Sequence, residues 1–75
     1  MAKLPQISGQ ECKRALEKGG FYFVRRSGGN HMYMRRDNPF AQVAVPDHPV
    51  LGKGVLRAII RDAGLTVDQF VALLE

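Results

Sequence analysis

Very few side chains in this sequence could transfer a proton near neutral pH. They are two histidines, His31 and His48, and the single cysteine, Cys12. The histidines lie 17 residues apart and the sequence contains no CxxC or HExxH motif, so no spacing suits a metal ion. There is also no P-loop and no convincing Ser–His–Asp arrangement. These features predict a protein without a metal or cofactor, in which the two histidines are the candidates for acid–base chemistry.

His31 stands at the point where a glycine-rich turn becomes a predicted strand. Gly28 and Gly29 in this turn leave room for the backbone of a ligand to approach closely. Because side chains alternate along a strand, His31, Tyr33 and Arg35 should share one face. An imidazole, a phenol and a guanidinium in a row could act on a phosphodiester by proton transfer, base stacking and phosphate neutralisation. The alternative, which the pattern leaves open, is a half-buried hairpin histidine without a chemical task.

Positive charge is concentrated in the first half of the chain. Residues 1–36 carry eight Lys and Arg against two Glu, a balance of +6, whereas residues 37–75 have a balance of −2. Two adjacent arginine pairs contribute to this excess, which favours a polyanion such as nucleic acid as partner. The alternative is an ordinary solvated surface, because the total of +4 is usual for a small soluble domain.

A second basic group is expected on a helix in the second half. Lys53, Arg57 and Arg61 are four residues apart, so they should lie along one helix face and could follow phosphates; an ordinary solvated face is the alternative. Gly52–Gly54 opens this helix and could hold one phosphate at its N-terminus. His48 lies in a loop, where we expect it to be exposed.

The elements that must position these residues have the order α-β-β-β-α(-α). Capping-box patterns at Ser8 and Thr66 start two of the helices. The predicted elements are a helix at 9–18, strands at 21–26, 31–36 and 41–45, a helix at 53–63 and a short helix from 66. Met32 and Met34 should point into the core. The helix at 53–63 should have one apolar face, formed by Val55, Leu56, Ile59, Ile60 and Ala63, and Pro46 should end the third strand. We predict an α+β fold, a three-stranded antiparallel meander with helices on one face, whose order resembles the double-stranded-RNA-binding domain.

Length and composition limit the possible classes of protein. At 75 residues the chain should be one domain, 1–75, with a core over about 8–74, too small for a cofactor-filled cleft. A single cysteine cannot form an internal disulfide, which favours a reducing compartment. No apolar run approaches the roughly 20 residues that span a membrane, and residues 1–5 do not resemble a signal peptide, so we expect a cytoplasmic protein.

Two segments are characteristic in sequence. Residues 52–65 have the sequence GKGVLRAIIRDAGL, and residues 28–31 have the sequence GGNH. Four shorter groups of residues accompany these segments: Gly20-Phe21, Val24-Arg25-Arg26, Val45-Pro46 and His48-Pro49. Together they resemble the HicA family of bacterial toxins over about residues 8–74, and the first segment is similar to that family's (K/R)GTLRxILRxAGL run.

The resemblance implies a double-stranded-RNA-binding-like fold and an mRNA interferase, which cleaves RNA without a metal or the ribosome and so blocks translation. It also implies a cognate HicB antitoxin that masks the active site, and His31 as the catalytic residue. The RNA-binding residues that we expect beside it are Gly29, Asn30, Tyr33, Arg26, Arg35, Lys53 and Arg57. A non-catalytic RNA-binding or protein-interaction module with the same fold is the alternative.

The sequence departs from the family pattern at three positions. Asn30 replaces the usual Ser before the histidine, Met32 replaces a second histidine, and Val55 replaces a Thr. Asn can donate a hydrogen bond and accepts a left-handed backbone, so the turn should still form. We expect the fold to be unaffected.

Overall fold

The computed structural model describes residues 3–75; residues 1 and 2, which begin the stretch considered above for a signal peptide, lie outside this range. The elements in chain order are α1 (Gly9–Lys18), β1 (Tyr22–Arg26), β2 (His31–Asp37), β3 (Phe40–Pro46), α2 (Lys53–Asp62) and α3 (Val67–Leu74). The three strands form an antiparallel sheet in the order β1-β2-β3. This confirms the predicted α+β meander and its element order.

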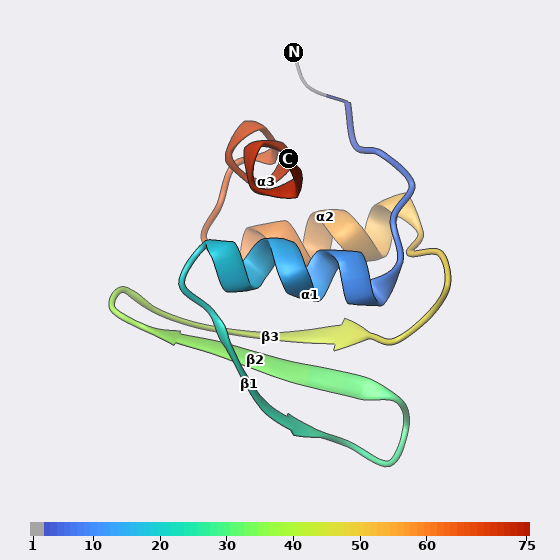
Figure 1. The fold of residues 1–75 in the computed structure, drawn as a ribbon, viewed down its shortest axis with the longest axis vertical. Coiled ribbons are helices and arrows are strands. Elements are labelled where there is room, and N and C mark those ends of the chain that lie inside the picture. Colours follow the sequence, from blue (N-terminus) through green and yellow to red (C-terminus); the bar gives the residue numbers. More distant parts are fainter. Residues whose placement is uncertain (1–2) are drawn as a thin grey trace.

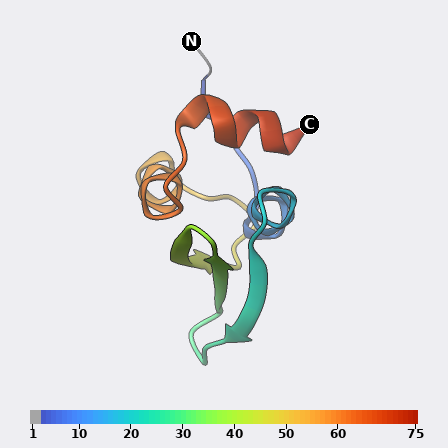
Figure 2. The ribbon, with the colours of Figure 1, turned by 90° about the vertical axis from the view of Figure 1, so that its left-hand side faces the viewer.

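All three helices lie on the same side of the sheet. α1 and α2 run side by side over one face, and α3 crosses above them as an outer layer (Figures 1 and 2). The opposite face of the sheet is covered by no helix of the described chain. The fold therefore has one core, between the sheet and the helices, and one open sheet face.

Side chains from every element except β1 form the core. Met32 and Met34 are fully buried on β2, as predicted from strand alternation, and Val43 and Val45 continue this face on β3. The other buried apolar residues are Ile7, Cys12, Ala15, Leu16, Phe21, Ala41, Leu51, Leu56, Ile59, Ile60, Ala63 and Phe70. Burial of these side chains provides most of the stability of a domain this small.

The helices begin and end close to the predicted residues. Ser8 and Thr66 both form complete capping boxes, with Glu11 and Gln69 respectively, so the start signals of α1 and α3 are confirmed. Gly20 ends the turn after α1 with a φ of +95°, which favours glycine. Gly64 has the same role after α2, with a φ of +74°.

Three sequence predictions need correction. Val55 was expected on the buried stripe of α2, but it is 45% exposed, because positions 56, 59, 60 and 63 already fill the i, i+3, i+4, i+7 face. Pro46 was expected to end β3, yet it is the last residue of that strand and pairs with His31. A proline is tolerated there because β3 is an edge strand. Phe21 was placed in the first strand, but it precedes β1 and is buried in the core.

Candidate active site

The open face of the sheet carries the predicted catalytic row. His31, Tyr33 and Arg35 alternate along β2 with the buried Met32 and Met34, so all three point away from the helices. The prediction that they share a face is confirmed. His31 and Tyr33 are half-buried and Arg35 is exposed, so a ligand lying across this face would reach all three side chains.

The turn before His31 is held in one conformation by backbone hydrogen bonds. The N–H of Ser27 donates to the carbonyl of His31 over 2.9 Å, which closes the hairpin. Asn30 has a φ of +62°, the left-handed conformation that asparagine accepts better than most residues. A Cβ built at Gly29 would lie 3.6 Å from Nδ1 of His31, so the imidazole rests beside this glycine. Gly29 and Asn30 therefore shape the position of the histidine ring.

Asp47 connects this turn to two other parts of the fold. Its N–H donates to the carbonyl of Asn30 over 2.8 Å. Its carboxylate accepts hydrogen bonds from Arg26 on β1, at 2.8 Å, and from Gln10 on α1, at 3.2 Å. The hydrogen bonds from Arg26 and Gln10 hold the pKa of this carboxyl below its usual range. Asp47 thus fixes the end of the sheet at which His31 begins β2.

Arg25 is a member of the site that the sequence analysis missed. Its guanidinium lies over the ring of Tyr33, with 4.6 Å between the guanidinium carbon and the ring centroid. This cation–π pair holds a stacking surface and a positive charge together on the open face, one strand away from His31. The pairing of Arg25 with Tyr33 across β1 and β2 depends on a local irregularity in β1.

That irregularity is a β-bulge at Val24. Phe23 pairs with Met34 and Arg25 pairs with Tyr33, so Val24 is left out of the register. A bulge shifts the alternation of side chains by one residue. It turns Arg25 to the open face and Arg26 to the helix side. No residue type marks the bulge in the sequence, so alternation along the strand could not predict that Arg25 lies on the open face.

The far end of the open face carries a second polar cluster. The hydroxyl of Tyr22 donates to both carboxylate oxygens of Asp37 over 3.0 Å, and Nε of Arg35 donates to the same carboxylate over 2.9 Å. The hydrogen bond from Arg35 and, to a smaller extent, that from Tyr22 hold the pKa of Asp37 below its usual range. The guanidinium of Arg35 also lies 5.8 Å from the ring centroid of the exposed Phe40. Arg35 is therefore fixed in place at a distance from His31.

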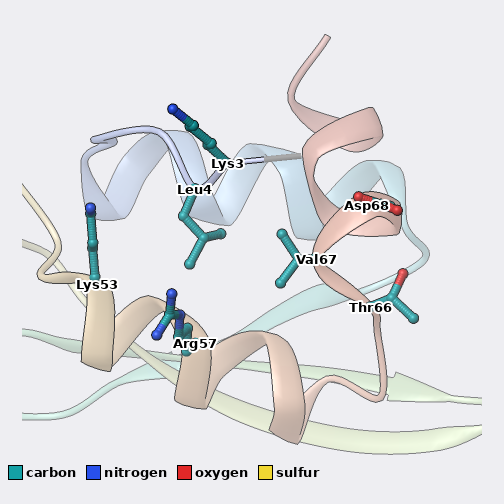
Figure 3. A pocket seen from close by; sticks show the side chains of 7 residues that line it. All are labelled: Lys3, Leu4, Lys53, Arg57, Thr66, Val67 and Asp68. Carbon is teal, nitrogen blue, oxygen red and sulfur yellow. The ribbon is translucent and has the colours of Figure 1, made fainter. Parts of the chain in front are cut away.

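The structure does not bring the remaining predicted RNA-binding residues to this face. Arg26 is bound to Asp47 on the helix side of the sheet. Lys53 and Arg57 rise from α2 away from the strands and line a groove between α2, α3 and the N-terminal segment (Figure 3). The residues expected beside His31 are thus divided between two sides of the molecule.

Arg36 shows that not every arginine of the basic half serves a surface. Its guanidinium lies 4.8 Å from the ring centroid of Phe21. It donates to the carbonyl of Pro39 over 2.9 Å and to that of Ala63, at the end of α2, over 3.1 Å. Arg36 joins the sheet to α2 and is structural.

The other two groups able to transfer a proton are poorly placed for chemistry. Cys12 is fully buried in the core, and burial raises the pKa of its thiol to about 12. His48 is exposed in the loop after β3, as predicted, and its carbonyl accepts a hydrogen bond from the N–H of Gly9 over 2.9 Å. Of these three groups, His31 is the one that lies on the open face.

Comparison with known families shows the family of the chain. Residues 9–65, well over half of the chain, match the family model of the HicA toxin of bacterial toxin–antitoxin systems. The chain belongs to the HicA toxin family. The matched range contains the whole sheet and the turn before His31, and it ends before α3. No curated protein matches the chain.

Two further findings describe what this HicA-family chain lacks within residues 3–75. No group of three or more His, Cys, Asp or Glu side chains in that range is arranged to hold a metal ion. None of its helices is both long and apolar enough to cross a membrane.

Proposed function

We propose that this HicA-family toxin is a metal-independent endoribonuclease that cleaves mRNA in the cytoplasm and so blocks translation. The observation that carries the proposal is the position of His31. It lies half-buried on an open sheet face beside Tyr33, and Arg25 covers the Tyr33 ring. One proton-transfer group, one stacking surface and one fixed positive charge are the parts that phosphodiester cleavage needs.

In the proposed reaction the RNA supplies its own nucleophile. His31 accepts the proton of a ribose 2′-hydroxyl, and the 2′-oxygen attacks the adjacent phosphorus. The bond from phosphorus to the 5′-oxygen breaks, and this oxygen takes a proton from water. The products are a 2′,3′-cyclic phosphate and a 5′-hydroxyl. Because the second proton comes from water and not from a second histidine, we expect a modest catalyst.

Negative charge grows on the phosphate during this step, and the geometry favours Arg25 as the cation that stabilises it. Arg35 is four residues from His31 along β2, roughly 13 Å at the rise of a β-strand. Arg25 is opposite Tyr33, only two residues from His31 along β2. We therefore assign Arg35 to a neighbouring phosphate, and Gly29 and Asn30 to the ribose–phosphate backbone that approaches the turn.

Membership of a toxin–antitoxin family implies an antitoxin partner. We propose that it resembles HicB and inhibits the toxin by covering His31. A protein lying on the open sheet face would exclude RNA from His31 and Tyr33 together, since both side chains are reached only from that face.

The test is whether purified toxin degrades a single-stranded transcript in the presence of EDTA. We expect cleavage with 2′,3′-cyclic phosphate ends, and no cleavage of the same sequence carrying 2′-O-methyl groups, which cannot supply the nucleophile. Stable RNA binding without cleavage would instead support the non-catalytic binding module. Cleavage of the 2′-O-methyl RNA would exclude the proposed nucleophile.

A further inference from the structure

The molecule has a second basic surface, which the proposed reaction does not use. It is a groove on the opposite side of the helical layer from the open sheet face. It has a volume of about 670 Å³ and lies between α2, the start of α3 and the N-terminal segment (Figure 3). Lys3, Lys53 and Arg57 supply positive charge, and Asp68 is the one acidic residue that lines it. Its lining therefore has a net charge of +2.

Two cations of the groove, Lys53 and Arg57, have no carboxylate partner among the described residues. The ion pairs that form within residues 3–75 involve other basic side chains, namely Lys13, Arg26, Arg35 and Arg61, none of which lines the groove. The Lys53 and Arg57 side chains are both exposed and rise from one face of α2, one helical turn apart (Figure 3). Two like charges held side by side without an acid between them attract a polyanionic partner.

The bottom of the groove is apolar. Leu4 and Val67 line it and are half-buried, and Leu4 also packs against the core. This combination favours a peptide over RNA. An apolar side chain of a peptide would gain free energy by entering such a floor, whereas a phosphate backbone has no group to place there. The groove also has no aromatic lining residue on which a base could stack.

We propose that this groove binds an acidic segment of the antitoxin, with carboxylates on Lys53 and Arg57 and an apolar side chain against Leu4 and Val67. The inference rests on the toxin–antitoxin part of the proposed function and not on the ribonuclease reaction. Because the groove lies on the other side of the molecule from His31, an antitoxin held there does not cover the catalytic face through this contact. The groove contact holds the partner, and a separate contact inhibits.

The test measures the affinity of full-length toxin variants for the purified antitoxin encoded beside the toxin gene, by calorimetry at about 0.15 M salt. We expect Lys53→Glu/Arg57→Glu to weaken binding at least tenfold. The matched control is Arg61→Glu, which makes the same change of charge one turn further along α2, outside the groove, and should change the affinity less than twofold. All three side chains are exposed.

A neutral variant, Lys53→Gln/Arg57→Gln, should also lose antitoxin affinity, but less. It serves as a second variant in case the double substitution by Glu prevents folding. RNA cleavage by both double variants should match the wild type. Unchanged antitoxin affinity in both would overturn the inference, and so would loss of RNA cleavage with antitoxin affinity retained, which would make the groove an RNA site. If the wild type cleaves no RNA but the variants still lose antitoxin affinity, the reaction is wrong and the groove assignment stands.

Discussion

Tyr33 and Arg25 show how single residues set up the open face. The guanidinium of Arg25 lies 4.6 Å from the Tyr33 ring centroid, so each side chain limits the motion of the other. Both would then lose less conformational entropy in the proposed binding of RNA. His31 has a different form of support, because its ring rests beside Gly29 and its backbone is fixed by Ser27.

Replacing Arg25 by Ala should weaken RNA binding about fivefold, since the change removes a cation–π contact and a phosphate contact. The slope of log affinity against log salt concentration should also fall by about one. Fluorescence anisotropy with a labelled single-stranded RNA measures both quantities. Arg61→Ala removes the same charge from an exposed position on α2 and should leave both nearly unchanged. Equal effects of the two substitutions would remove Arg25 from the site.

The Asp47 carboxylate should make the stability of the folded protein depend on pH. Its pKa is lowered in the folded protein, so this carboxylate contributes stability above pH 4, near its unfolded pKa, and the contribution is lost as pH falls through the folded value. Urea unfolding at pH 6 and pH 3 should show a lower midpoint at the acid pH, with a smaller difference in Asp47→Asn. The same difference in the variant would mean that Arg26 and Gln10 do not stabilise the charged form.

At the scale of elements, close packing of α1 on the end of β3 sets the position of the site. Gly9, the first residue of α1, is buried, and a Cβ built there would collide with the carbonyl of Pro46. Pro46 is the β3 residue paired with His31. A side chain at position 9 would therefore push α1 away from the end of the sheet at which the catalytic row begins.

We expect Gly9→Ala to lower the free energy of unfolding by about 1–3 kcal/mol, the usual cost of overpacking. Gly54→Ala is the matched control, because a Cβ at this exposed position of α2 meets nothing within 4 Å. It should be neutral or stabilise the protein by up to about 1 kcal/mol, since alanine favours the helix. Chemical denaturation measures both. A Gly9→Ala protein as stable as the wild type would mean that α1 is not held tightly against β3.

The sequence was sufficient to predict the elements but not the register of one strand. Capping boxes, turn glycines and the Met32/Met34 alternation are local signals, so the helices and the face of His31 followed from them. The bulge at Val24 depends on how β1 fits against β2, and no local signal reports that fit. The position of Arg25 on the open face could therefore not be predicted from the sequence, whereas the resemblance to the family already pointed to His31.

At the scale of the whole molecule, the helical layer separates the two proposed sites. The open face of the sheet lies on one side of the helices (Figure 1), and the basic groove between α2, α3 and the N-terminal segment lies on the other (Figure 3). Residue spacing placed Lys53 and Arg57 correctly on one helix face. It could not show which way that face points, because the direction depends on α3 packing over α2.

α3 lies beyond the residues matched by the family model, yet the fold depends on it. Phe70 is fully buried and is the largest side chain without solvent contact. Phe70→Ala should lower the free energy of unfolding by about 3–5 kcal/mol, a large part of what a domain this small possesses. Leu73→Ala, at a half-buried position of the same helix, should cost less. A loss below about 1 kcal/mol for Phe70→Ala, measured by thermal or urea unfolding, would mean that α3 is dispensable.

The most direct test of the proposed reaction is the rate of RNA cleavage by His31→Ala in EDTA, with His48→Ala as the matched control. Loss of the proton-transfer group should slow cleavage at least about 100-fold. His48→Ala should cleave at the rate of the wild type, because that side chain is exposed in the loop after β3. Circular dichroism would establish that both variants are folded. A folded His31→Ala protein that cleaves RNA as fast as the wild type would contradict the assignment of His31 as the catalytic residue.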